Sequence, residues 1–481
     1  MSESRLARNT TYLTVASLMQ KVISLWYFAY LSNSLGTENT GKYAYALTFT
    51  SVFSLFMDFG IGQVLTREGA KDPDHLQEHV DRVIGLKIML MMVAWIVMFG
   101  TILGANIIFQ NVTAEDVLLV AVASIAMTID TVTSLCWSVF RAKKQLLYEA
   151  ISTFVYQIAV VVSGVILLKI DAPLPLLIGA LSVGSLLQSI GMLTLVFKKA
   201  RIRFRIRFNK KDAQTIFLIS WPFAVANLCN RLYGSVDQQL LKVTVSNTHA
   251  AWYAIAYKSV FALTVIPGSF ATSYYPVMSE YLKHNTQAAG KTFSNALVYM
   301  LLLSIPISFG VLVLGEDIIL AVWDTVWGTA AQPLRVLMYA LPFVFLNYPI
   351  GNLLNAAGLQ RTNTRNMIIA LMINVVLNFV LIPYFSYMGA AYAFLTSSIV
   401  LVIIGFPTAY RIAPFAYGIV LKKAAIFLLS GAIMAGILFA IQHSYNLLSL
   451  IGISAVVYGA LVFLLRGIAL SDIRAILSRK M

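Results

Sequence analysis

Apolar residues fill this chain in long runs that are separated by short polar gaps. Runs such as residues 84–108 and 292–314 exceed the roughly 20 apolar residues that a helix needs to cross a bilayer. Fourteen membrane-spanning helices are therefore predicted, at residues 10–35, 41–65, 84–108, 114–140, 150–170, 173–197, 213–244, 251–275, 292–314, 333–357, 364–385, 389–410, 424–443 and 446–466. The gaps leave no room for a separate soluble domain.

Composition supports the same class. Of the 481 residues, 59% are hydrophobic and 11% are charged, which is too little charge to cover a soluble protein of this size. The apolar runs are continuous rather than alternating, and this excludes a membrane β-barrel. The predicted fold is an all-α polytopic membrane protein.

The formal net charge is +15, and most Lys and Arg residues fall in one set of alternating loops and helix ends. The opposite set of loops and helix ends holds only Lys42, Lys169, Lys242 and Arg335. Since basic loops face the cytoplasm, we expect a multi-pass protein of the cell inner membrane with both termini cytoplasmic. This bias explains the charge without nucleic acid as a partner.

A weak internal repeat appears at an offset of 210 residues, where Gln20-Lys21 aligns with Asn230-Arg231. The repeat predicts two six-helix lobes of the same orientation, followed by two additional helices. The predicted parts are 1–197 (N-terminal lobe), 198–212 (basic cytoplasmic linker), 213–412 (C-terminal lobe) and 413–481 (two helices and a cytoplasmic tail).

The linker includes KKARIRFRIRFNKK at residues 198–211, where basic and apolar residues alternate. Such a strip suits contact with anionic membrane lipids. It serves either as an orientation anchor, the simpler interpretation, or as a tether between moving lobes.

Two cations lie near the middle of the membrane in the first helix of each half: Lys21 in the first predicted helix and Arg231 in the seventh. A charge near the bilayer centre costs at least about 2.5–3.5 kcal/mol, so such residues usually face a wet cavity or a partner. Together they predict a cationic site for an anion such as pyrophosphate. Alternatively, each is neutralised by a buried acid and only fixes packing.

Four further ionisable residues are candidates for a gate or for ion coupling. Asp237 and Lys258 lie at similar depth on consecutive helices, where they form either a structural pair or a gate. Asp58 either binds a coupling ion, pairs with Arg67, or caps the chain near Gly60. Asp130 binds H⁺ or Na⁺, or neutralises Lys21; these alternatives remain open.

Amide side chains in the second half are candidates for sugar contacts. We include Asn227, Asn230, Asn352, Asn355 and Asn374. Hydrogen bonds between helices would explain such residues equally well, at about 0.6 kcal/mol each.

Enzymatic motifs are weak. His75-x-x-Glu78-His79 fits the inverted zinc-protease pattern, but it lies in a short loop without a surrounding domain, so we interpret it as a solvated turn. Cys136 and Cys229 lie within apolar runs, which favours packing. We expect no catalytic residues, no metal and no cofactor, except H⁺ or Na⁺ as a coupling ion.

The chain resembles the Wzx-like oligosaccharide flippases, a family within the multidrug/oligosaccharidyl-lipid/polysaccharide (MOP) exporter superfamily. The resemblance rests on LFMDFGIGQVLTREGA at 55–70, WPFAVANLCNRLYGSVDQQLL at 221–241, AWYAIAYKSV at 251–260, NLLNAAGLQR at 352–361 and GAAYAF at 389–394. Coverage is nearly complete, and the layout of twelve helices plus two also fits.

The resemblance implies transport of a polyprenyl-pyrophosphate-linked oligosaccharide, such as an O-antigen unit of lipopolysaccharide, from the cytoplasmic to the outer leaflet. Alternating access around a cationic central cavity would place Lys21, Arg231 and Lys258 against the pyrophosphate or acidic sugars. A polysaccharide polymerase and glycosyltransferases are the expected partners. Lipid II flippases, multidrug extruders and a non-transporting scaffold for polysaccharide assembly are the alternatives.

Overall fold

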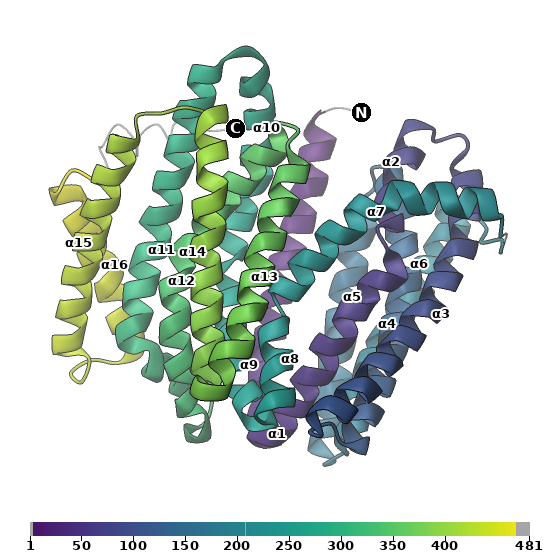
Figure 1. Cartoon of the computed structure of the whole chain (residues 1–481), viewed down its shortest axis with the longest axis horizontal. Helices are drawn as coiled ribbons and strands as arrows, with labels where there is room; N and C mark the ends of the chain where they lie inside the picture. Colours follow the sequence, from purple (N-terminus) through teal and green to yellow (C-terminus); the bar gives the residue numbers. More distant parts are fainter. Residues whose placement is uncertain (1–2, 207, 468–481) are drawn as a thin grey trace. The chain divides into compact units, whose positions relative to one another are not determined.

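The computed structural model describes residues 3–206 and 208–467, and within these residues the chain is helical and contains no strand (Figure 1). The predicted all-α fold is confirmed. The elements are α1 (Glu3–Asp58), α2 (Ile61–Lys71), α3 (Leu76–Phe109), α4 (Ala114–Ala142), α5 (Leu147–Lys169), α6 (Leu174–Leu195), the π-turn η1 (Val196–Ala200), α7 (Lys210–Tyr233), α8 (Val236–Thr244), α9 (Asn247–Leu263), α10 (Val265–His284), α11 (Thr286–Val322), the 3₁₀ turn η2 (Thr325–Ala330), α12 (Ala331–Ala356), α13 (Gln360–Phe385), α14 (Tyr387–Ile412), α15 (Tyr417–Ile441) and α16 (Leu447–Leu464).

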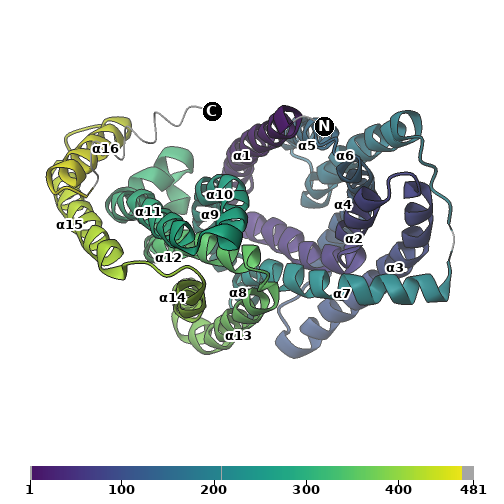
Figure 2. The same cartoon turned by 90° about the horizontal axis from the view of Figure 1, so that it is seen from above.

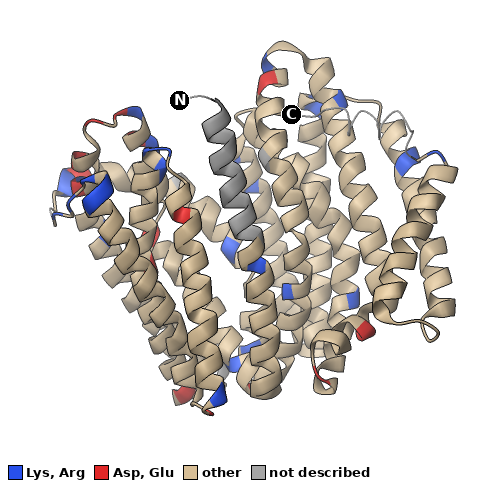
Figure 3. Ribbon diagram, turned by 180° about the vertical axis from the view of Figure 1, so that it is seen from behind, with Lys and Arg blue, Asp and Glu red and all other residues tan. Residues whose placement is uncertain are grey.

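Twelve helical stretches among the described residues are long and apolar enough to cross a membrane. One of them, Met19–Lys71, covers the first predicted span from residue 19 onward and the whole of the second. The predicted span 213–244 is not among the twelve; it forms two helices, α7 and α8. These two differences account for the twelve stretches against fourteen predicted spans. Charged positions lie mostly at helix ends (Figure 3).

α1 contains one sharp break, and a second break separates α1 from α2. Gly36 has φ 71°, which lies in the left-handed region that only glycine enters freely, so α1 is two helices joined at a kink. The break falls between the first two predicted spans. A second break follows at Phe59 and Gly60, with φ 45° and 75°, inside the predicted span 41–65. That span therefore ends earlier than predicted.

Two other predicted spans are each interrupted. Residues 213–244 form α7 and α8 rather than one helix, with a turn at Gly234 and Ser235 where the Ser235 hydroxyl donates to the Arg231 carbonyl. Residues 251–275 change helix at Thr264, where the Thr264 hydroxyl donates to the Phe261 carbonyl. Pro267 has no N–H for the carbonyl four residues earlier, which favours a helix start here. The sequence prediction of one continuous helix was wrong for 213–244, whereas 251–275 lies within one described stretch, Asn247–His284, that is long and apolar enough to cross a membrane.

The first compact unit is Met1–Ala254. Within it α6 packs against α4 and α5, and α1 against α4 and α5. α7 lies across α2 and α3 and also contacts α1 (Figure 2). A buried core joins α2, α3 and α4 to the end of α6 and to α7, and it contains Cys136. α7 and α8, which the repeat assigns to the second half, are thus part of the first unit.

The second compact unit is Ile255–Met481. α11 packs against α12, and α14 packs against both α12 and α13. α15 and α16 contact each other and α11, so the last two helices form an addition on one helix of this unit. The predicted boundaries at residues 197, 212 and 412 stay predictions.

Gly60 combines a left-handed φ with close contacts from α7. A Cβ there would lie 2.9 Å from Phe223 Cβ and 3.0 Å from the Ser220 carbonyl oxygen of α7. Gly60→Ala should therefore lower the thermal unfolding temperature in detergent, because it adds a clash to about 1–2 kcal/mol of left-handed strain. Gly358→Ala, at the C-terminal end of α12, is the matched control, with φ 77° and nothing within 4 Å. Equal destabilisation by the two changes would contradict the tight contact with α7.

Candidate functional site

The two predicted intramembrane cations both lie in the first unit. Lys21 is on α1 and is partly buried, whereas Arg231 is in the last turn of α7 and is exposed. Arg231 thus lies three residues before the Gly234 turn, not in the middle of one long helix. Lys258, on α9, is partly buried and belongs to the second unit. A shared phosphate site for these residues stays a prediction.

Asp58 accepts a backbone hydrogen bond from Gly62, in agreement with the predicted cap, and it has a further partner that was not predicted. Lys87 Nζ of α3 lies 2.7 Å from Asp58 Oδ1, and the Ser134 hydroxyl of α4 bonds the same carboxylate at 3.2 Å. Arg67 instead bonds Glu68, at 2.7 Å. The Lys87 side chain is only 4% exposed, so this ion pair holds α1, α3 and α4 together. A carboxylate with these partners is better suited to hold helices together than to bind a coupling ion.

Asp130 remains the stronger candidate for a coupling ion. It lies on α4 and its side chain is exposed, beside Ser185 of α6. Tyr27 of α1 and Tyr156 of α5 are near neighbours. Its carboxylate therefore faces polar groups from three other helices of the first unit.

Asp237, in the first turn of α8, is buried and accepts a hydrogen bond of 2.6 Å from the Tyr253 hydroxyl of α9. Both residues belong to the first unit. This contact gives Asp237 a structural role that the sequence did not indicate, and the predicted pair with Lys258 stays a prediction.

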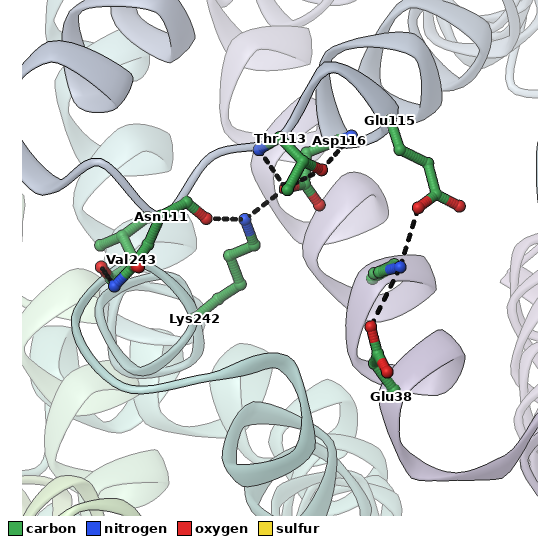
Figure 4. Close-up of polar contacts among 8 residues, drawn as sticks. Glu38, Asn111, Thr113, Glu115, Asp116, Lys242 and Val243 are labelled. Carbon is green, nitrogen blue, oxygen red and sulfur yellow. Dashed lines mark hydrogen bonds and ion pairs between the residues drawn. The ribbon is translucent and has the colours of Figure 1, made fainter.

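Among the ion pairs of the described residues, the most deeply buried involves Lys242 of α8, a residue near the end of the predicted span 213–244. Lys242 Nζ lies 2.6 Å from Asp116 Oδ2 and 2.8 Å from the Asn111 carbonyl oxygen, and both charged side chains are 1% exposed (Figure 4). The Tyr45 ring lies 4.9 Å from the same ammonium. The Asn111 amide donates in return to the Val243 carbonyl at 3.1 Å. This cluster fixes α8 to the loop between α3 and α4.

Local sequence explains how Asp116 is held. Thr113 and Asp116 form a capping box at the start of α4, in which the carboxylate accepts from the Thr113 amide at 2.8 Å. Next to it, Lys42 bonds Glu38 at 3.1 Å and Glu115 at 2.8 Å (Figure 4). The acids of this second cluster are exposed, so it is the weaker of the two.

The predicted sugar-contacting amides differ in accessibility. Asn374 is wholly buried between α13 and α14, where it donates to Ser397 at 3.4 Å and accepts from Asn378. This favours the interhelical alternative for Asn374. Asn352 bonds the Tyr348 carbonyl, and Asn355 accepts from Asn363. Asn230 is exposed and bonds the Ala226 carbonyl, whereas Asn227 is partly buried.

The His75-x-x-Glu78-His79 segment begins α3. Asp72 accepts from His75 at 3.0 Å and raises the pKa of that imidazole, chiefly through this hydrogen bond. Glu78 pairs with Arg82 at 3.6 Å. No group of three or more potential metal ligands occurs within residues 3–206 and 208–467.

The buried pair predicts a large loss of stability when one partner is removed. Lys242→Met should destabilise the protein by about 3–5 kcal/mol, because Asp116 would remain buried and charged. Adding Asp116→Asn should recover part of the loss, measured by denaturant unfolding in micelles.

Lys42→Met is the matched control for that test, since its acidic partners are exposed. We expect Lys42→Met to lower the free energy of unfolding by no more than about 1 kcal/mol. Equal losses from Lys42→Met and Lys242→Met would contradict the stronger role of the buried cluster.

Comparison with known proteins agrees with this architecture. The family model described as "Polysaccharide biosynthesis protein" matches residues 6–282, and a second model, MatE, matches residues 222–380. The capsular polysaccharide biosynthesis protein CapF of Staphylococcus aureus is 20% identical over 83% of this chain and 98% of its own length. The probable low-salt glycan biosynthesis flippase Agl15 of Haloferax volcanii is 22% identical, over 95% of this chain and 94% of its own.

Among solved structures, the lipid II flippase MurJ in an inward closed conformation superimposes with a TM-score of 0.79 at 16% identity. The match covers 97% of this chain and 99% of the MurJ chain, so the two share a fold. Because the first family model spans more than half of the sequence, the chain belongs to the polysaccharide biosynthesis protein family of the MOP superfamily.

Proposed function

We propose that this protein is a flippase that moves a polyprenyl-pyrophosphate-linked oligosaccharide from the cytoplasmic to the outer leaflet. The observation that carries the proposal is the pair of cations in the first unit, Lys21 on the apolar stretch Met19–Lys71 and Arg231 in the last turn of α7. The family match and the flippase and capsule names of the two relatives support glycan transport.

The chemistry of the cations suits a pyrophosphate group. A lysine ammonium attracts phosphate as a point charge, and an arginine can hold two phosphate oxygens in one plane. Placing either charge against hydrocarbon costs about 2.5–3.5 kcal/mol or more. A role in binding an anion would explain why both cations are present despite this cost. Lys258 is a third cation for the pyrophosphate or for acidic sugars.

The transport cycle that we propose is alternating access. Lys21 and Arg231 capture the pyrophosphate on the cytoplasmic side, and a conformational change exposes it to the other side. Asp130 is the proposed site for H⁺ or Na⁺, whose gradient would reset the carrier. The basic linker at residues 198–212 would face the cytoplasm, as would both termini, in the cell inner membrane.

Removal of either cation should reduce transport. We expect Lys21→Gln and Arg231→Gln each to lower export at least about tenfold, since a hydrogen bond to a charged group contributes about 1.5–3 kcal/mol. The measurement is complementation of a flippase-null strain, combined with mass spectrometry of the polyprenyl-linked sugars that accumulate. Lys21→Arg and Arg231→Lys should retain more activity than the neutral variants.

Lys169→Gln serves as the control, because Lys169 is an exposed cation at the end of α5. Protein levels in the membrane must match the unmodified protein for each variant. Full export by both neutral variants would overturn the cationic site and favour a scaffold. Accumulation of lipid II in place of a polyprenyl-linked oligosaccharide would overturn the proposed substrate.

A further inference from the structure

A cavity of about 610 Å³ lies where α6 ends and the basic linker begins. Its lining residues are Phe197, Arg201, Arg203 and Phe204. This volume is within the range of small-molecule sites, about 300–1,000 Å³. The cavity, which we term the linker cavity, therefore combines two guanidinium groups with two aromatic rings.

The backbone that carries the two arginines is held at several points. Lys143 Nζ of α4 bonds the Ala200 carbonyl at 2.8 Å, and the Ile202 side chain is buried in the core. The Gln77 side chain of α3 bonds both the N–H and the carbonyl of Arg203, at 2.8 and 2.6 Å. Arg201 and Arg203 thus extend from fixed positions, and both are exposed. Preorganised arginines lose less entropy when they bind an anion.

The charge of the cavity favours an anion. Among the described residues that line it, none is acidic. The carbonyl end of a helix disfavours an anion, but here the Val196 and Ala200 carbonyls already accept bonds from the Ile202 amide and from Lys143. Lys198 and Lys199 add two further positive charges in the same turn.

An apolar track on α6 leads to this cavity. Val183, Leu187, Ile190 and Phe197 are 44–59% exposed, and their spacing places them on one face of the helix. On the linker, Ile206 and Phe208 are also exposed, at 76% and 59%. Exposed apolar residues interleaved with arginines are typical of the boundary between headgroups and acyl chains.

We propose that the linker cavity binds the phosphate of one anionic phospholipid, such as phosphatidylglycerol. Arg201 and Arg203 hold the phosphate, Phe197 and Phe204 pack on the glycerol region, and the acyl chains follow the exposed face of α6. This lipid is a bound partner rather than the transported substrate, so the inference does not depend on the proposed flippase function. It gives the predicted contact with anionic lipids a discrete site.

Native mass spectrometry of the full chain tests the proposal, with phosphatidylglycerol or phosphatidylcholine added to detergent-solubilised protein. The unmodified protein should retain phosphatidylglycerol in preference to phosphatidylcholine. Arg201→Gln/Arg203→Gln should weaken phosphatidylglycerol binding at least about tenfold. Phosphatidylglycerol should also raise the unfolding temperature of the unmodified protein but not that of the double variant.

Lys210→Gln/Lys211→Gln is the matched control, since it removes the same charge from α7 without touching the cavity. This control should bind phosphatidylglycerol as the unmodified protein does. If both double variants lose phosphatidylglycerol binding equally, the attraction is non-specific. If neither variant loses binding, the cavity is not the site. Either result overturns the proposal. Displacement of the lipid by millimolar inorganic phosphate would mean that the cavity recognises free phosphate, which also contradicts it.

Discussion

An ionised side chain among apolar helices must find a partner or water, and this constraint explains the most informative contacts of the molecule. Two buried lysines meet it in the same way, by forming ion pairs that join separate helices. Lys87 joins α3 to Asp58 at the end of α1, and Lys242 joins α8 to Asp116 at the start of α4. Removing one partner of such a pair lowers the stability of the fold, because the other charge remains buried. The charges therefore fix which helices lie together.

The second pair has a particular consequence for the organisation of the chain. By sequence, α7 and α8 begin the second repeat. In the structure, α7 packs on α1, α2 and α3, and α8 is bonded to the loop before α4. Lys21 and Arg231 consequently belong to one compact unit, although the sequence predicts equivalent positions for them in two repeats. A pyrophosphate site that uses both cations would therefore draw on side chains of a single unit.

Hydrophobic run length predicted the fold class well, because any helix that spans lipid must satisfy its own backbone. It did not predict the breaks at Gly60 and Gly234, because the predicted spans run through both positions. Local backbone chemistry marks the first break, with left-handed φ at Gly60. The break at Thr264 lies next to Pro267, which has no N–H for a helical hydrogen bond. The candidate site was harder to predict. The Thr113-x-x-Asp116 capping pattern indicates a fixed carboxylate, but no local signal pairs it with Lys242, which is distant in sequence.

Direct binding of the charged headgroup tests the central claim most clearly. A short-chain polyprenyl diphosphate without sugars isolates the pyrophosphate contribution, and its affinity can be measured by calorimetry on the purified protein. The account predicts that this ligand binds the unmodified protein at least about tenfold more tightly than Lys21→Gln/Arg231→Gln, and that the difference shrinks for the monophosphate. Equal affinities of the folded double variant and the unmodified protein would contradict it.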